Sequence, residues 1–166
     1  FLTAKKIVEE LEGELILSKT GHAYITEAMT KTGAIFAGEA SAHYYYKATG
    51  NAESQVMTIV GVLKVLTEEN KPISVVAEEF RRSYESGEFN YEVANAQEIM
   101  DKLKEIYNDA DLSELDGIAI NYPTWRFSVR TSNTEPLLRV NVEALDKETM
   151  EKQTAKLKVD IEGIAK

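Results

Sequence analysis

Groups that could bind an anion gather in one short part of this sequence. Three of the five arginines, Arg126, Arg130 and Arg139, lie within fourteen residues, and the only acid between the first and the last is Glu135. The local charge is therefore positive inside a chain whose formal net charge is −9. Because the overall field of such a chain repels anions, this stretch predicts a local anion site.

The loop from Thr131 to Pro136 supplies further donors to this site. It lies between two predicted strands, Arg130 precedes it, Arg139 follows it, and it contains Ser132, Asn133 and Thr134. Guanidinium forks, hydroxyls and backbone N–H groups together suit the oxygens and double charge of a phosphate. The alternative is an ordinary hairpin loop whose arginines form surface ion pairs.

A second polar cluster follows an apolar strand predicted over residues 33–38. Glu39, Ser41 and His43 alternate in sequence, so an extended loop would point all three the same way. A carboxylate and a hydroxyl side by side suit vicinal sugar hydroxyls. The alternative is a strand end with its own local hydrogen bonds.

A third cluster, Lys19-Thr20-Gly21-His22, precedes a predicted helix. Lys19 and His22 could meet an anion at the N-terminus of that helix, and the alternative is a capping turn with exposed charges. Neither histidine has further ligands at metal-binding spacing, so we predict no metal site in this chain. The tyrosines at 44–46 could stack on a sugar ring, but they more simply form a strand that packs on both faces.

Two sets of elements must position these clusters. In the first, apolar spacing predicts helices at 4–11, 23–30, 54–68 and 75–83, alternating with short strands at 14–17 and 33–38. This order indicates an α/β layer with a parallel sheet, and we assign residues 1–79 to a truncated α/β domain with a mixed sheet. The apolar stripe of the 54–68 helix predicts a core position.

In the second set, residues alternate as in half-buried antiparallel strands around 89–93, 118–120, 127–129 and 138–142. Helices are expected at 96–107 and from about 147 to the end. We therefore predict a small α+β domain, residues 80–166, with an antiparallel sheet and two helices.

Composition excludes several classes of protein. The chain has 166 residues and no cysteine, so it can hold neither disulfides nor thiolate metal sites. Both halves are acidic, which argues against nucleic acid as a partner. No apolar run approaches the ~18 residues of a membrane span, and no secretory signal is visible. We therefore expect a cytoplasmic protein with no membrane partner.

The three clusters, in this order and on these elements, resemble the α-D-phosphohexomutase superfamily, and most closely its phosphomannomutase/phosphoglucomutase branch. The matching motifs read Lys-Thr-Gly-His, Gly-Glu-Ala-Ser-Ala-His and Arg-Thr-Ser-Asn-Thr-Glu-Pro-Leu-Leu-Arg. The resemblance covers nearly the whole chain, but only most of domain three and then domain four of that four-domain family.

The resemblance implies roles for individual residues. Glu39, Ser41 and His43 would contact sugar hydroxyls, and His22 would be a second active-site histidine. Arg130, Ser132, Asn133, Thr134 and Arg139 would hold a phosphate, with Lys19 as a further anion contact. The chain departs from the family pattern at Ala42, where glycine is usual. Asn133 favours the hexose branch, because phosphoglucosamine mutases tend to carry glycine there.

The resemblance also implies what lies outside this chain. The family's reaction needs a phosphoserine in domain one and a Mg²⁺-binding aspartate loop in domain two, and neither motif occurs here. The first strand of domain three is also expected to be absent, which predicts an open sheet edge and self-association.

The implied function is therefore the C-terminal part of a phosphohexomutase. Such an enzyme interconverts hexose 6-phosphate and hexose 1-phosphate through hexose 1,6-bisphosphate, and this part alone is expected to be inactive. The alternatives are a stand-alone phosphosugar-binding module without catalysis and a structural interaction domain.

Overall fold

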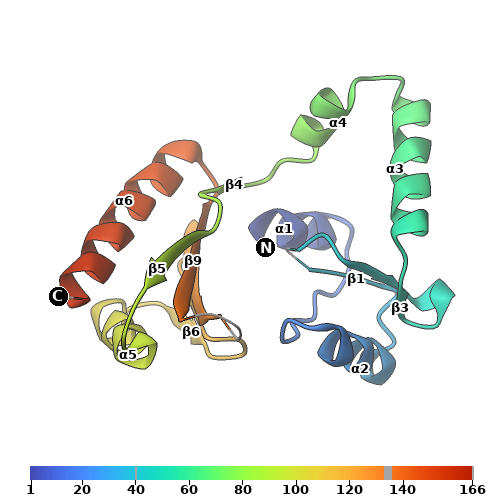
Figure 1. The fold of residues 1–166 in the computed structure, drawn as a ribbon. Helices are drawn as coiled ribbons and strands as arrows, with labels where there is room; N and C mark the ends of the chain where they lie inside the picture. The colour runs from blue at the N-terminus through green and yellow to red at the C-terminus, as the bar shows by residue number, and fades with distance from the viewer. Residues whose placement is uncertain (40, 133–135, 166) are drawn as a thin grey trace. The chain divides into compact units, whose positions relative to one another are not determined.

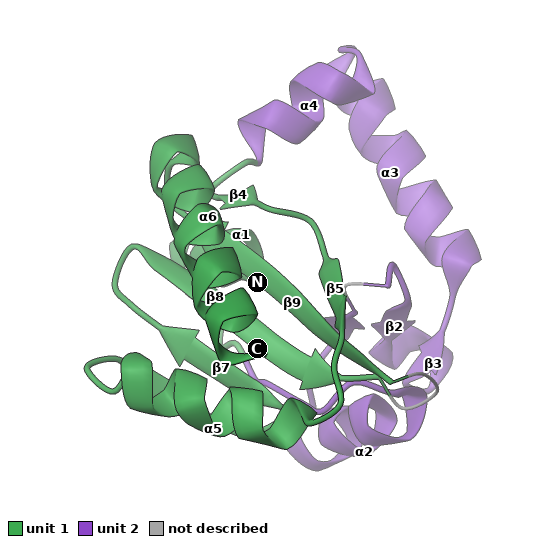
Figure 2. Ribbon diagram, turned by 60° about the vertical axis from the view of Figure 1, so that its left-hand side comes forward, with its two compact units in different colours: residues 1–15, 81–166 green, residues 16–80 purple. Residues whose placement is uncertain are grey.

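A computed structural model describes residues 1–39, 41–132 and 136–165. The chain divides into two compact units, shown in different colours in Figure 2. Unit 1 contains residues 1–15 and 81–166, and unit 2 contains residues 16–80. Figure 1 shows the elements of both units along the chain. The expected division into domains at residue 79 stays a prediction.

Unit 1 is built on an antiparallel sheet with strand order β4-β9-β8-β7-β6, and β5 pairs with β9 beside β4. Its elements are α1 (Leu2–Glu10), β4 (Tyr84–Glu85), β5 (Phe89–Glu92), α5 (Ala96–Ile106), β6 (Asp111–Ser113), β7 (Ile118–Asn121), β8 (Trp125–Thr131), β9 (Leu137–Ala144) and α6 (Lys147–Ile164). The predicted antiparallel sheet with two further helices is confirmed.

The hydrophobic core of unit 1 stabilises the packing of its sheet against helices α5 and α6. Alternate residues of β8 and β9, among them Phe127, Val129 and Val142, are fully buried against Leu103 of α5 and Leu157 of α6. Each such side chain contributes about 1.5–3 kcal/mol of transfer free energy. Helices α5 and α6 therefore cover one face of the sheet, as Figure 2 shows. The intervening residues of β8 lie on the opposite face.

Unit 2 has a smaller core and a three-stranded antiparallel sheet of order β1-β2-β3. Its elements are α2 (His22–Thr32), β1 (Phe36–Gly38), β2 (Tyr44–Tyr46), the 3₁₀ helix η1 (Lys47–Thr49), β3 (Ala52–Glu53), α3 (Gln55–Glu69) and α4 (Ile73–Glu79). Its buried centre consists of Ile25 and Met29 of α2 with Tyr45 of β2.

Mixed α/β content is confirmed for this part of the chain, but the expected parallel sheet is wrong for the described residues. Strands β1 and β2 are joined by a five-residue loop and pair antiparallel. A parallel pair needs a crossover of about a dozen residues or more, so this connection permits only a hairpin. The strand expected at 14–17 does not form, and these residues pair with no described strand. The helix expected at 75–83 spans residues 73–79.

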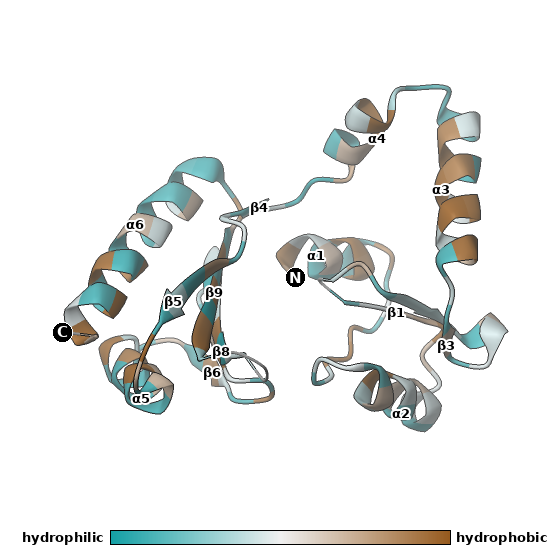
Figure 3. Cartoon of the chain, viewed as in Figure 1, coloured by the Kyte–Doolittle hydropathy of each residue, from teal (hydrophilic) through white to brown (hydrophobic). Residues whose placement is uncertain are grey.

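The expectation that the apolar stripe of α3 is core is also wrong. Val56, Ile59, Val60 and Leu63 are more than half exposed, and no residue of α3 is buried. Figure 3 shows the apolar character of this helix along its length. Periodicity predicted the helix correctly because it reports which residues share a face, but it does not report what covers that face.

Candidate functional site

The first candidate cluster lies on the hairpin loop between β1 and β2, residues 39–43. The loop is closed by a hydrogen bond from the Glu39 N–H to the His43 carbonyl (2.9 Å), and the Ala42 N–H donates to the Glu39 carbonyl (3.0 Å). Ala42 has a φ of 63°. This is the left-handed region, which glycine occupies without cost. The residue at which the chain departs from the family pattern therefore sits where the backbone favours glycine.

The structure brings the three predicted residues of this loop into one hydrogen-bonded chain. The Ser41 hydroxyl donates to Oε2 of Glu39 (2.8 Å), and the Ser41 Oγ lies 2.8 Å from Nδ1 of His43. A serine hydroxyl has only one hydrogen to donate. Because that hydrogen goes to Glu39, the Nδ1 of His43 must carry a hydrogen and donate it to Ser41. The Nε2 of His43 then remains for a ligand.

Tyr45 of β2 also bonds to Glu39, a contact that the sequence does not predict. Its hydroxyl donates to Oε1 of Glu39 (2.9 Å), so each carboxylate oxygen of Glu39 accepts a bond from within the unit. Its ring lies 5.5 Å, centroid to centroid, from the ring of His22 at the start of α2. His22 is thus brought to the same cluster as Glu39. Lys19 lies instead over the ring of Tyr24, with its Nζ 5.9 Å from the ring centroid.

The second candidate cluster lies on the β8–β9 hairpin of unit 1. Arg130 and Arg139 are directly opposite one another in the register of these strands. Like charges in this position repel. The carboxylate of Glu88 compensates them, with contacts of 3.5 Å to Arg130 and 3.7 Å to Arg139. The third arginine of the stretch, Arg126, is instead occupied by the buried Glu143 at 3.0 Å.

The loop beyond these arginines is closed by the Ser132 N–H, which donates to the Leu137 carbonyl (2.8 Å). Nη2 of Arg139 lies 3.5 Å from the Ser132 hydroxyl. Two further predicted residues, Asn133 and Thr134, lie outside the described residues. The structure therefore brings Arg130, Arg139 and Ser132 together at one end of the hairpin.

Gly117 lies against the backbone of Val129 and Arg130 and was not predicted from the sequence. Its φ is 72°, and a Cβ atom there would lie 2.3 Å from the Val129 carbonyl oxygen and 2.8 Å from the Cα of Arg130. Only glycine permits this close approach. The turn before β7 therefore fixes the backbone at Arg130. The nearby Asp116 in Asp116-Gly117 is a turn signal that could have indicated it.

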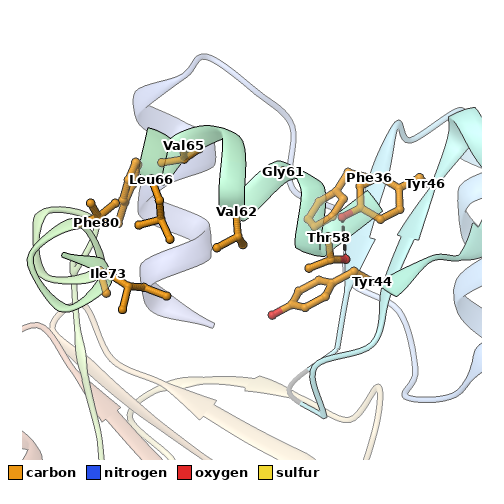
Figure 4. A pocket seen from close by; sticks show the side chains of 12 residues that line it. Phe36, Tyr44, Tyr46, Thr58, Gly61, Val62, Val65, Leu66, Ile73 and Phe80 are labelled. Atoms are coloured by element: carbon orange, nitrogen blue, oxygen red, sulfur yellow. Dashed lines mark hydrogen bonds between the residues drawn. The ribbon is translucent and has the colours of Figure 1, made fainter. Parts of the chain in front are cut away.

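Unit 2 also contains an open apolar cavity of about 450 Å³. Figure 4 shows aromatic side chains of β1 and β2, among them Phe36 and Tyr44, on one side and aliphatic residues of α3 and α4 on the other. This lining lacks the charged groups that a phosphosugar requires, so the two polar clusters are the candidate sites.

Within the described part of the chain, no group of three or more acids and histidines could hold a metal ion. No helix among the same residues is long and apolar enough to cross a membrane.

Comparison with known families identifies the chain. Residues 2–84 match the phosphoglucomutase/phosphomannomutase alpha/beta/alpha domain III, and residues 88–158 match the C-terminal domain of the same family. The chain belongs to the phosphoglucomutase/phosphomannomutase family. The predicted resemblance to the C-terminal half of a phosphohexomutase is thereby confirmed.

Individual members of the family agree with this assignment. The chain is 42% identical over 153 residues to a phosphomannomutase of Methanocaldococcus jannaschii, covering 92% of this chain and 34% of the relative. It is 40% identical to a phosphomannomutase of Escherichia coli, covering 83% of this chain and 31% of the relative. It therefore spans about a third of the length of these relatives.

The fold agrees as well. The crystal structure of a phosphoglucomutase/phosphomannomutase family protein from Burkholderia thailandensis superposes with a TM-score of 0.79 at 24% identity. The match covers 96% of this chain and 34% of that one.

Proposed function

We propose that this chain supplies sugar and phosphate binding to a phosphohexomutase that interconverts hexose 6-phosphate and hexose 1-phosphate. In such an enzyme a phosphoserine transfers its phosphoryl group to the free hydroxyl of the substrate, giving the hexose 1,6-bisphosphate. The other phosphoryl group then returns to the serine. The single observation that carries the proposal is the pairing of Arg130 and Arg139 beside the hydroxyl of Ser132 in a member of this family.

The role of the arginine pair is to hold the phosphate that is not reacting. Phosphoryl transfer requires little covalent chemistry from the protein, so positioning supplies much of the rate. Two guanidinium groups offer ten N–H donors in total, five from each. A substrate that must bind in two orientations needs such a redundant set of donors. Ser132 adds a hydroxyl, and we keep Asn133, Thr134 and Lys19 as further proposed contacts.

The role of Glu39, Ser41 and His43 is to bind the hydroxyls of the sugar ring. A carboxylate has about four acceptor positions, and two donors from within the unit leave room for hydroxyl donors of a ligand. His22, whose ring packs on Tyr45, completes this set. We assign no proton transfer to it.

Magnesium enters the proposal only through the rest of the protein. The described residues of this chain do not fit a Mg²⁺ site, since no group of acids among them could hold a metal. The phosphoserine and the metal loop are proposed to lie in N-terminal domains like those of the longer relatives. A cytoplasmic location, where phosphorylated sugars are made and used, is part of the same proposal.

A titration of this 166-residue chain tests the proposal. Amide NMR spectra would be recorded with mannose 6-phosphate, glucose 1,6-bisphosphate, mannose and inorganic phosphate. We expect shifts at Arg130 and Ser132 with every phosphorylated ligand, and shifts at Glu39 and Ser41 only when the ligand also carries a sugar. A chain that shows neither set of shifts at millimolar ligand would overturn the proposal. Binding without turnover in the full-length protein would instead support the non-catalytic module.

We also propose that isolated chains self-associate. Strand β1 is an edge of its sheet, and Ile35 and Phe36 beside that edge are 77% and 51% exposed. An unpaired apolar edge tends to recruit another strand. Sedimentation over a wide range of concentrations is expected to show a dimer or larger species. A strict monomer at every concentration would contradict this part of the proposal.

A further inference from the structure

Tyr45 differs from its two neighbours in the same strand. The side chains of Tyr44 and Tyr46 are half-buried and line the apolar cavity, whereas Tyr45 is only 2% exposed. Because successive residues of a strand point to opposite faces, Tyr45 alone faces the core formed with Ile25 and Met29. A buried tyrosine hydroxyl needs a partner, and here its partner is a residue of the 39–43 loop.

The contact of Tyr45 with Glu39 ends a chain of hydrogen bonds whose hydrogens can be arranged in one way. The tyrosine hydroxyl donates to Oε1 of Glu39, and the Ser41 hydroxyl donates to Oε2. His43 then donates from Nδ1 to Ser41, as derived above. A carboxylate only accepts, so every donor points toward Glu39. The orientation of Glu39 therefore determines the orientation of the other two side chains.

Tyr45 is the member of this chain that the core holds in place. Ser41 and His43 are exposed, and Glu39 is half-buried, so none of them is fixed by packing. The Tyr45 ring is fixed by its burial and by its contact with His22, 5.5 Å away on another element. One buried side chain thus connects the start of α2 to the loop that follows β1.

We propose that Tyr45 is a positioning residue for sugar binding: its hydroxyl orients Glu39, and through Glu39 it sets Ser41 and the Nδ1–H form of His43. This inference rests on the proposed function, in which the 39–43 loop binds the sugar. In the Nδ1–H form, the Nε2 of neutral His43 is an acceptor, as is Glu39. The loop therefore selects a sugar whose hydroxyls donate hydrogen bonds to it.

The strand supplies matched variants for a test. Tyr45→Phe removes the hydroxyl that bonds to Glu39. Tyr46→Phe removes a hydroxyl that bonds to Thr58 of α3 at 2.9 Å, away from the loop. Tyr44→Phe removes the hydroxyl of Tyr44, which, like Tyr46, lines the cavity. All three variants lose one oxygen atom from the same short strand, so differences among them report the contact with Glu39.

Two measurements on the 166-residue chain decide the inference. The first is the ring-nitrogen NMR spectrum of the neutral His43 imidazole, which distinguishes the Nδ1–H from the Nε2–H form. We expect Tyr45→Phe to shift His43 toward the Nε2–H form, and both control variants to leave it unchanged. The second is the affinity for glucose 1,6-bisphosphate, which we expect Tyr45→Phe to weaken about five- to tenfold, within the range for the loss of one ordinary intramolecular hydrogen bond, because Tyr45 acts on the ligand only through Glu39.

The outcomes separate this inference from the proposed function. If the parent chain binds no phosphosugar, the proposed function fails, while the His43 spectrum still reports whether Tyr45 sets the loop. If the parent binds and Tyr45→Phe matches Tyr46→Phe in both the spectrum and the affinity, then Tyr45 is merely structural and the inference is overturned.

A last measurement covers the case in which Tyr45→Phe does not fold. A buried hydroxyl that donates to a carboxylate exchanges its proton slowly, so the Tyr45 hydroxyl proton is expected in cold spectra of the parent chain. Its absence would overturn the inference.

Discussion

Hydrogen bonds among its side chains and to Tyr45 of β2 hold the 39–43 loop of unit 2. The arginine pair of unit 1 is instead positioned by the strands β8 and β9. In the loop, three contacts of 2.8–2.9 Å join His43, Ser41, Glu39 and Tyr45. In the hairpin, Glu88 approaches Arg130 and Arg139 only to 3.5 and 3.7 Å, and its side chain is 42% exposed.

This difference matches what each region is proposed to bind. Sugar hydroxyls are neutral and directional, so their partners gain most from being oriented before the ligand arrives. A phosphate is a dianion whose attraction to arginine depends less on direction. The arginines can therefore exchange a weakly held carboxylate for a ligand, since exposed ion pairs contribute only ~0–1 kcal/mol.

The largest expected effect concerns catalysis, which neither region is expected to perform alone. Both clusters are proposed to bind ligand, but the chain has neither a metal-binding group among its described residues nor a matching serine loop in its sequence. We expect the purified 166-residue chain to show no mutase turnover in a coupled assay with glucose 1-phosphate and glucose 1,6-bisphosphate. Turnover above the background of a heat-denatured sample would show that the binding regions suffice.

The next largest effect concerns Arg130, the proposed principal anchor of the phosphate. Loss of a charge-assisted hydrogen bond costs ~1.5–3 kcal/mol, so Arg130→Ala is expected to weaken binding of phosphorylated ligands about ten- to a hundredfold. Arg130→Lys keeps the charge but loses the bidentate fork, and is expected to fall between Ala and the parent. The side chain lies on the open face of the sheet, so thermal stability should change little.

Isothermal titration with glucose 1,6-bisphosphate measures the effect of these variants. Arg81→Ala is the control, because it removes the same charge from unit 1 at a residue whose guanidinium instead lies over the ring of Tyr84. Equal affinity of the parent and both Arg130 variants would show that phosphate is held elsewhere.

These two regions also show which structural features could be predicted from the sequence. Alternation in β8 predicted which residues are buried and which are on the open face, because period-two spacing is set by the strand itself. The arginine pair was likewise predicted, since both residues border one hairpin loop. Contacts that depend on tertiary packing were not predicted. Glu88, which precedes β5, and Tyr45, one of three identical neighbours, carry no local signal of their partners.

The exposed helix α3 also shows that a local pattern does not predict tertiary packing. Its apolar residues predicted a core position, but a core requires a second surface, and none of the described residues covers this stripe. Likewise, strands were expected at 33–38 and at the tyrosines 44–46, but the length of the loop between them was not used to decide the direction of their pairing.

A pH experiment tests the hydrogen bond between Tyr45 and Glu39 that holds the 39–43 loop. Burial, the hydrogen bond to Glu39 and the charges of Glu39 and Glu53 raise the pKa of Tyr45 to about 12 from its ordinary value of 10.0. A raised pKa means that the folded state favours the neutral hydroxyl. The resulting stability is fully present below about pH 10 and is lost as the pH rises toward 12.

The measurement is urea unfolding of the parent and of Tyr45→Phe between pH 9 and pH 12. Other tyrosines, including Tyr91 and Tyr107, also have raised pKa values, so the parent alone would not isolate the contribution of Tyr45. The difference between the two proteins is expected to shrink across this range. A difference that stays constant with pH would show that the Tyr45 hydroxyl is not bonded to a carboxylate in the folded state.

The smallest expected effect tests whether Glu88 competes with the ligand. Its carboxylate compensates two arginines that face one another across the β8–β9 pair, so a phosphate must displace it or add its charge beside it. Glu88→Gln removes that charge and is expected to tighten phosphate binding about two- to threefold at low salt, as the loss of an exposed ion pair allows. The gain should shrink in 0.5 M salt, because salt screens exposed charges.

Glu105→Gln on the exposed side of α5 is the control for net charge. Weaker binding by Glu88→Gln alone would mean that Glu88 orients the arginines rather than competing with the ligand, and the contrast between an exchangeable and a preorganised site would then be lost.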